Sequence, residues 1–200
     1  MDKVHTLNDT RATLLQTGLK LFAEQGYNGT GIKEIVDAAG VPKGSFYNYF
    51  KSKEDFGAEV IAYYATCFGN TWSQYFAEGP EQPLAALRYT YERMISYHEQ
   101  CEVKAGCLLG NFAAEMSESS ELCRVTLQEV VTSWRKRFVS YLRKAQADGT
   151  VRTDLSAEQL ADFFWNAWEG ALLRMKIERS TAPVRACVNL MFDHFFLPQH

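Results

Sequence analysis

Apolar residues recur along nearly the whole chain at the three- and four-residue spacing that lines one face of a helix. The clearest run places an aromatic or aliphatic residue at positions 160, 163, 164, 167, 168, 171, 172 and 175. No run of strict alternation between apolar and polar residues is long enough to indicate a strand. The pattern therefore predicts an all-α fold with about nine helices.

Glycine and small polar residues mark where these helices begin and end. We expect Thr30 to cap the second helix and Gly40 to end that same helix. Ser52–Asp55 and Ser156–Gln159 resemble the capping boxes that open longer helices. The predicted helices cover residues 9–25, 31–39, 42–50, 52–76, 84–99, 108–116, 120–147, 156–178 and 181–196.

The composition excludes several classes of protein. Of 200 residues, 46% are hydrophobic and 14% aromatic, which is too apolar for a disordered chain. The apolar stretches fall short of the roughly 20 residues that a membrane span needs, and the first residues lack the apolar segment of a signal peptide. The five cysteines are an odd number without a repeated spacing. We therefore expect thiols rather than disulfides, a cytoplasmic location and no membrane association.

The charge is unevenly distributed along the chain. A net charge of -3 gives no indication of a nucleic-acid partner. Residues 1–56 carry seven basic and seven acidic side chains, yet the stretch 41–53 holds Lys43, Lys51 and Lys53 and no carboxylate. Positive charge is thus concentrated in one short segment, and the acidic excess belongs to residues 57–200.

This basic segment lies in a predicted helix-turn-helix, because residues 31–50 form two short helices joined by a glycine turn. Phe46 and Phe50 account for the buried side of the second helix. The residues left outward are unusual for a solvated surface: Lys43, Gly44, Ser45, Tyr47, Asn48 and Tyr49. Glycine allows close approach to DNA, Ser and Asn can bond base edges, and Lys and Tyr can bond phosphates. The alternative is that the lysines are ordinary solvated side chains and the tyrosines are packing residues.

Several residues in this region, at fixed spacing from one another, resemble the N-terminal signature of the TetR family of transcriptional regulators. They are residues 22–27, Thr30, Ile35, 39–41, 43–47, 49–50 and 52–54. Gly18 and Val36 depart from the pattern, since alanine is commoner there. The resemblance implies a three-helix DNA-binding domain over residues 1–56 and a helical effector-binding and dimerisation domain over 57–200. It also implies phosphate contacts from Thr30, Lys43, Tyr47, Tyr49 and Lys53, and positions near base edges for Gly44, Ser45 and Asn48.

The last two predicted helices, near 156–178 and 181–196, carry more apolar residues than one core face requires. Trp165 and Leu173 lie off the main stripe of the first helix, and Leu190 and Phe196 widen the stripe of the second. Such helices favour a partner surface. We expect a homodimer through a four-helix bundle, which would let two recognition helices bind a palindromic operator. The alternative is that both faces are buried within one chain.

Cys107 follows a glycine at the start of a short predicted helix, where backbone N–H groups favour a thiolate. The surrounding segment resembles the TetR-like subgroup that includes the N-ethylmaleimide-reductase repressor, in which the matching cysteine senses oxidants and electrophiles. The resemblance extends to residues 173–177 and implies that Lys176 lies near this thiol; Trp168 is assigned to the same effector region. The alternative is that Cys107 is simply a small buried residue.

An enzyme is not expected, because no catalytic or nucleotide-binding motif is present and the four histidines are scattered. His98, Cys101, Cys107 and Cys123 match no zinc spacing, so neither a metal nor another cofactor is predicted. The sequence predicts a DNA-binding repressor released by an unidentified small molecule, and its alternative is a helical metal- or ligand-binding sensor that does not bind DNA.

Overall fold

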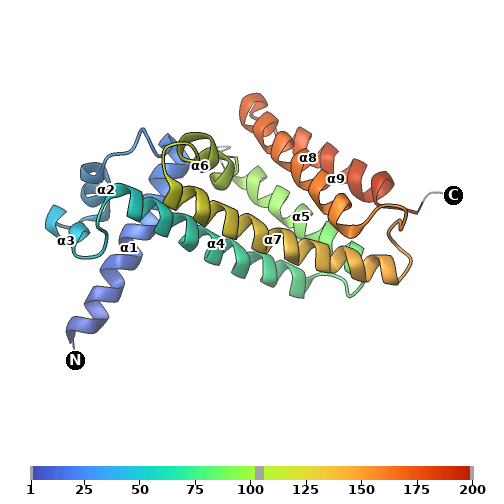
Figure 1. Ribbon diagram of the computed structural model, residues 1–200, viewed down its shortest axis with the longest axis horizontal. Coiled ribbons are helices and arrows are strands. Elements are labelled where there is room, and N and C mark those ends of the chain that lie inside the picture. The colour runs from blue at the N-terminus through green and yellow to red at the C-terminus, as the bar shows by residue number, and fades with distance from the viewer. Residues whose placement is uncertain (1, 102–105, 199–200) are drawn as a thin grey trace. The chain divides into compact units, whose positions relative to one another are not determined.

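The computed structural model describes residues 2–101 and 106–198, and for residues 2–9 the backbone alone (Figure 1). Within these ranges every regular element is a helix, and there is no strand. The elements are α1 Asp2–Gln25, α2 Ile32–Ala39, α3 Lys43–Tyr47, α4 Lys53–Glu78, α5 Pro83–Gln100, α6 Leu108–Met116, α7 Glu121–Ala147, α8 Ala157–Glu178, α9 Ala182–Leu190 and the π-helical turn η1 Met191–Phe195. The predicted all-α fold is confirmed.

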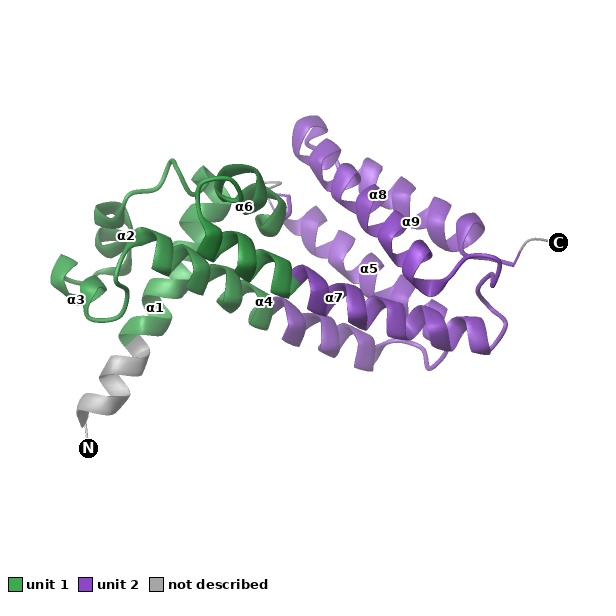
Figure 2. Ribbon diagram, in the orientation of Figure 1, with its two compact units in different colours: residues 1–67, 108–130 green, residues 68–107, 131–200 purple. Residues whose placement is uncertain are grey.

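The chain forms two compact units, coloured separately in Figure 2. Unit 1 comprises residues 1–67 and 108–130, and unit 2 comprises residues 68–107 and 131–200. Helices α4 and α7 each contribute residues to both units. The division into residues 1–56 and 57–200 concerns function and stays a prediction.

Five phenylalanines build the core of unit 1. Phe50 and Phe56 lie 4.8 Å apart between ring centroids, Phe46 and Phe56 5.2 Å, and Phe22 and Phe56 5.8 Å. All of them, with Phe112, are almost fully buried. Gly18 is required by this packing, because a Cβ atom there would lie 2.3 Å from Cζ of Phe56. The departure from alanine at position 18 therefore makes room for one aromatic ring.

A second aromatic cluster forms the core of unit 2. Phe138 and Phe164 stack with ring centroids 5.0 Å apart, and Tyr91 meets Phe164 edge-on at 4.8 Å and Trp168 at 4.9 Å. The aromatic stripe of α8 is thus largely core, as such stripes usually are. Phe163 is the exception, because it belongs to the predicted stripe yet is 52% exposed.

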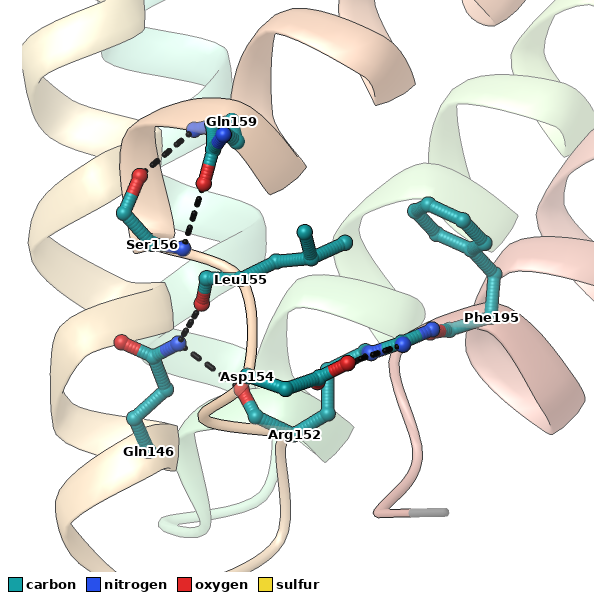
Figure 3. Close-up of polar contacts among 7 residues, drawn as sticks. All are labelled: Gln146, Arg152, Asp154, Leu155, Ser156, Gln159 and Phe195. Carbon is teal, nitrogen blue, oxygen red and sulfur yellow. Dashed lines mark hydrogen bonds and ion pairs between the residues drawn. The ribbon is translucent and has the colours of Figure 1, made fainter.

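Of the three predicted N-terminal caps, one forms completely, one forms in part and one does not form. Gly31, not Thr30, is the N-cap of α2, since the Thr30 hydroxyl is buried and donates to the Gly26 carbonyl at 2.8 Å. Ser52 accepts the Asp55 N–H at 3.0 Å, but the Asp55 carboxylate accepts the N–H of Lys51 instead of that of Ser52. The capping box of α8 is complete, with both reciprocal bonds between Ser156 and Gln159 (Figure 3).

The connection between α7 and α8 closes against the C-terminal turn (Figure 3). Gln146 donates to the carbonyls of Arg152 and Leu155 at 2.8 and 2.9 Å, and the N–H of Arg152 donates to the Phe196 carbonyl at 2.9 Å. The predicted single helix 181–196 becomes α9 followed by the π-helical turn η1. This turn carries Phe196 into the core at 0% exposure, so the expectation that Phe196 widens an outer surface is wrong.

Candidate functional site

The helix-turn-helix of unit 1 is built from α2, a glycine turn and α3. Gly40 adopts a left-handed conformation with φ of 67° and ends α2, where the N–H of Val41 returns to the Val36 carbonyl at 3.0 Å. This bonding and conformation stop the helix in a single residue. Pro42 then precedes α3, and Phe46 anchors α3 to the core. The opposite side of α3 faces outward.

The structure brings six of the predicted DNA-binding residues together on what we term the α3 surface: Lys43, Gly44, Ser45, Tyr47, Asn48 and Tyr49. Ser45 and Tyr49 are half-buried and the other four are exposed, Tyr47 by 52%. A Cβ atom on Gly44 would meet nothing within 4 Å, so the chain's own packing does not require glycine there. An absent side chain at an open position leaves space for a partner to approach the backbone.

Lys43 on the α3 surface and Lys51, which follows that surface in the chain, carry positive charge that is not neutralised locally. Within the described ranges, the salt bridges include none from Lys43 or Lys51, and both side chains are exposed. The ion pair of this region joins Lys33 to Asp37 of α2 at 3.7 Å. Two lysines thus remain available to a polyanion.

Thr30 and Lys53 lie elsewhere: Thr30 is part of what we term the α1–α2 turn, residues 26–31, and Lys53 packs against that turn. The Lys53 ammonium donates to the Tyr27 carbonyl at 2.6 Å and lies 4.2 Å from the Tyr27 ring centroid. Burial lowers the pKa of Lys53, and the nearby Glu115 carboxylate opposes that shift. The Thr30 hydroxyl is occupied by the Gly26 carbonyl. A phosphate contact from either side chain requires it to exchange its present partner.

The second candidate site surrounds Cys107, which is half-buried and directly precedes α6. Its thiol is hydrogen-bonded to the carboxyl group of Glu169 on α8, and burial raises the pKa of that carboxyl while the thiol contact opposes the rise. Gly106 has φ of 78°, and a Cβ atom there would lie 3.8 Å from Cδ of Lys176. A thiol, a half-buried carboxyl group and a lysine side chain are therefore associated with one loop and one helix of unit 2.

Sequence reasoning missed Glu169, because an isolated acidic residue on an amphipathic helix normally indicates solvent exposure. One signal was present, since Glu169 and Lys176 are two turns apart and share a face of α8.

Trp168 is only 3% exposed and belongs to the aromatic core. An open groove of about 450 Å³ elsewhere in unit 2 is lined by Gln82, Leu84, Ala85, Arg88, Thr150, Phe192, Leu197 and Pro198.

Helices α8 and α9 leave large apolar side chains uncovered within one chain. Leu173 is 60% exposed, Ile177 72% and Leu190 58%. Trp165 is half-buried instead, with its ring centroid 6.1 Å from that of Trp134. The prediction of an outer apolar surface thus applies to Leu173 and Leu190, and the structure adds Phe163 and Ile177.

Over residues 2–101 and 106–198, no three His, Cys, Asp or Glu side chains are grouped so that they could hold a metal ion. Across the same described residues, no helix combines the length and the hydrophobicity of a bilayer-crossing segment.

Two sequence profiles match the chain. The one described as "Bacterial regulatory proteins, tetR family" covers residues 14–60, and the one described as "Tetracyclin repressor-like, C-terminal domain" covers residues 83–191. The first range contains the helix-turn-helix and the second contains α5, α6, α7, α8 and α9.

Individual proteins are similar over nearly the full chain. The HTH-type transcriptional repressor DhaR of Mycobacterium sp. (strain GP1) is 36% identical over 92% of this chain and 90% of its own length. The crystal structure of regulatory protein TetR from Rhodobacter sphaeroides has a TM-score of 0.84 at 37% identity, covering 92% of this chain and 97% of that one. The reduced form of Escherichia coli NemR has a TM-score of 0.85 at 27% identity, with coverages of 94% and 97%.

Proposed function

The chain belongs to the TetR family of bacterial DNA-binding transcriptional regulators, and from that premise we propose that it is a repressor. It binds a palindromic operator as a homodimer and leaves the operator when an effector acts on the C-terminal part. The observation that carries this proposal is the α3 surface, where exposed Lys43, Tyr47 and Asn48 surround an open Gly44. The related proteins described above carry the names of regulators and repressors.

The α3 surface divides into two kinds of contact in this proposal. Lys43 and Tyr47, with the half-buried Tyr49, bond phosphates and fix the register of the protein on the duplex. Gly44, Ser45 and Asn48 face base edges in the major groove and supply sequence preference. Because Thr30 and Lys53 already bond the α1–α2 turn, we assign them to holding that turn.

A homodimer follows from the apolar surface of α8 and α9. Burying a Leu or Ile side chain stabilises an interface by about 1.5–3 kcal/mol. In a two-fold dimer each of these exposed residues would be buried in both protomers. Leu173, Ile177 and Leu190 are the candidates for this contact. A two-fold dimer would present two α3 surfaces to half-sites one helical turn, about 34 Å, apart.

The effector acts, in this proposal, by modifying Cys107. Addition of the thiol across an activated alkene forms an S–C bond and places the thiol proton on the neighbouring carbon, so no other reactant is needed. Glu169 accepts the thiol hydrogen bond and can carry the proton between sulfur and carbon. Lys176 lies beside the preceding glycine, and buried Trp168 fixes the helix beneath the site. One of the similar solved structures is described as a reduced form, which supports redox sensitivity in that relative.

The test is to select DNA from a random pool with the purified protein and to measure its affinity as a function of salt. A palindromic consensus and a steep loss of affinity with salt are expected. N-ethylmaleimide should release the selected DNA from the wild-type protein and not from Cys107→Ser. Failure to select any sequence would refute the operator proposal, and equal release from both proteins would refute the thiol proposal alone.

A further inference from the structure

One carboxylate of unit 1 bonds a turn that lies almost ninety residues before it in the chain. The α1–α2 turn presents the N–H groups of Tyr27 and Asn28, which have no helical partner. Glu115 of α6 accepts both, the first at Oε1 over 3.2 Å and the second at Oε2 over 2.7 Å. Bonds from N–H groups to a charged acceptor are about twice as strong as neutral ones.

The turn is shaped to admit this carboxylate. Gly26 has φ of 80°, a conformation that side-chain-bearing residues rarely adopt. A Cβ atom on Gly26 would also lie 2.6 Å from Oε1 of Glu115. Glycine is therefore required here by the backbone conformation and again by the space that Glu115 occupies.

An aromatic contact accompanies the polar one. Phe112 precedes Glu115 by one turn of α6, and its ring centroid lies 5.8 Å from that of Tyr27 and 5.4 Å from that of Phe22. Gly57 of α4 also makes room for Tyr27, because a Cβ atom there would lie 2.9 Å from the ring. Helix α6 thus contacts the turn through a carboxylate and a ring on the same face.

The turn leads directly into the DNA-binding motif. Only three residues separate Asn28 from α2, and the Gly40 turn joins α2 tightly to α3. A change in the path of residues 26–31 must therefore be taken up by α2 and α3. The effect of α6 on α3 passes through residues 26–31 and α2, so a direct contact between α6 and α3 is not needed.

We propose that Glu115 is a positioning residue for DNA binding: its carboxylate fixes the α1–α2 turn and thereby holds the α3 surface in the geometry that fits DNA. The proposal rests on the proposed operator binding for its effect on affinity, and it adds α6 as an element that sets the DNA-binding conformation.

The experiment compares Glu115→Gln with the matched control Glu118→Gln, an exposed residue in the turn that follows α6. Both remove one negative charge, which by itself would favour binding to a polyanion. The amide introduced by Glu115→Gln has a single acceptor oxygen, so one of the two N–H groups would lose its partner. Affinity for the selected operator and amide hydrogen exchange of the unbound protein are measured well below the unfolding temperature of each variant.

Glu115→Gln is expected to weaken operator binding about tenfold, the consequence of losing one hydrogen bond to a charged group. It should also accelerate amide exchange over residues 26–50 and leave α8 unchanged. Glu118→Gln should bind the operator at least as tightly as the wild type and should exchange its amides at the wild-type rate. Unchanged exchange over residues 26–50 in Glu115→Gln would overturn the proposal whether or not an operator is obtained. Equal operator affinity of the two variants would overturn it as well, while operator binding by the wild type would remain intact.

Discussion

Replacing Lys53 by methionine distinguishes a residue that touches DNA from one that holds the DNA-binding motif together. Methionine nearly preserves the length of the side chain and removes the positive charge and the hydrogen-bond donor. In the structure the Lys53 ammonium donates to the Tyr27 carbonyl at 2.6 Å and lies over the Tyr27 ring. The substitution therefore removes one charge-assisted hydrogen bond and one cation–π contact.

The magnitude follows from these two contacts. A hydrogen bond from a charged donor contributes about 1.5–3 kcal/mol when buried, and a cation–π contact about 0.5–1 kcal/mol at an exposed site. Lys53 is half-buried, so solvent reduces both contributions and about 1–2 kcal/mol is expected for the pair. For a chain of this size that loss lowers Tm by about 2–8 °C.

The assay pairs thermal unfolding with the salt dependence of operator binding, and Lys43→Met serves as the comparison. Each phosphate neutralised contributes about 0.9 to the slope of log affinity against log salt. Lys53→Met should lower Tm and keep the slope, whereas Lys43→Met should keep Tm and reduce the slope by about 1.8 in a dimer. A Lys53→Met protein with the wild-type Tm and a reduced slope would refute the assignment of Lys53 to the turn and restore it as a phosphate contact.

Three further outcomes are expected. Tyr47→Ala should weaken binding to all selected operators similarly, whereas Asn48→Ala should change the preference among them in a selection experiment; the reverse pattern would contradict the assigned contacts. Leu173→Glu should convert the dimer to a monomer, as measured by sedimentation, because an unpaired charge is costly to bury in an apolar interface. A variant that remains a dimer would show that the interface does not include Leu173. Glu169→Gln should slow alkylation of Cys107 by iodoacetamide at neutral pH, measured by mass spectrometry, since the carboxyl group that accepts the thiol proton is lost; faster alkylation would indicate that Glu169 only repels the thiolate.

Local sequence signals predicted most of the secondary structure. Helical periodicity and capping residues act over four or fewer positions, so they are present in the sequence itself. The box at Ser156–Gln159 forms as predicted, and α6 has the predicted bounds 108–116. The failure at the C-terminus has a local geometric cause. The π-helical turn η1 adds one residue per turn, as the Phe196 N–H bond to the Met191 carbonyl shows, and this shift carries Phe196 inward.

The candidate site was only partly predictable. The α3 surface could be recognised because Phe46 fixes which side of a short helix is buried, and the remaining residues follow. Thr30 and Lys53 were assigned outward roles because their partners, Gly26 and Tyr27, are not indicated by any local pattern.

Short-range spacing in the sequence is sufficient to establish that this protein is helical and that residues 43–49, apart from Phe46, present polar side chains outward. The residues of this segment also resemble the TetR family, to which the chain belongs. Tertiary packing sets which polar side chains meet: Glu115 with the turn at Tyr27, and Glu169 with the thiol of Cys107. The physical reason is that a half-buried carboxyl group needs polar partners, yet partners 62 and 88 positions away leave no periodicity in the sequence. Only the packing of the helices brings such groups within hydrogen-bond distance.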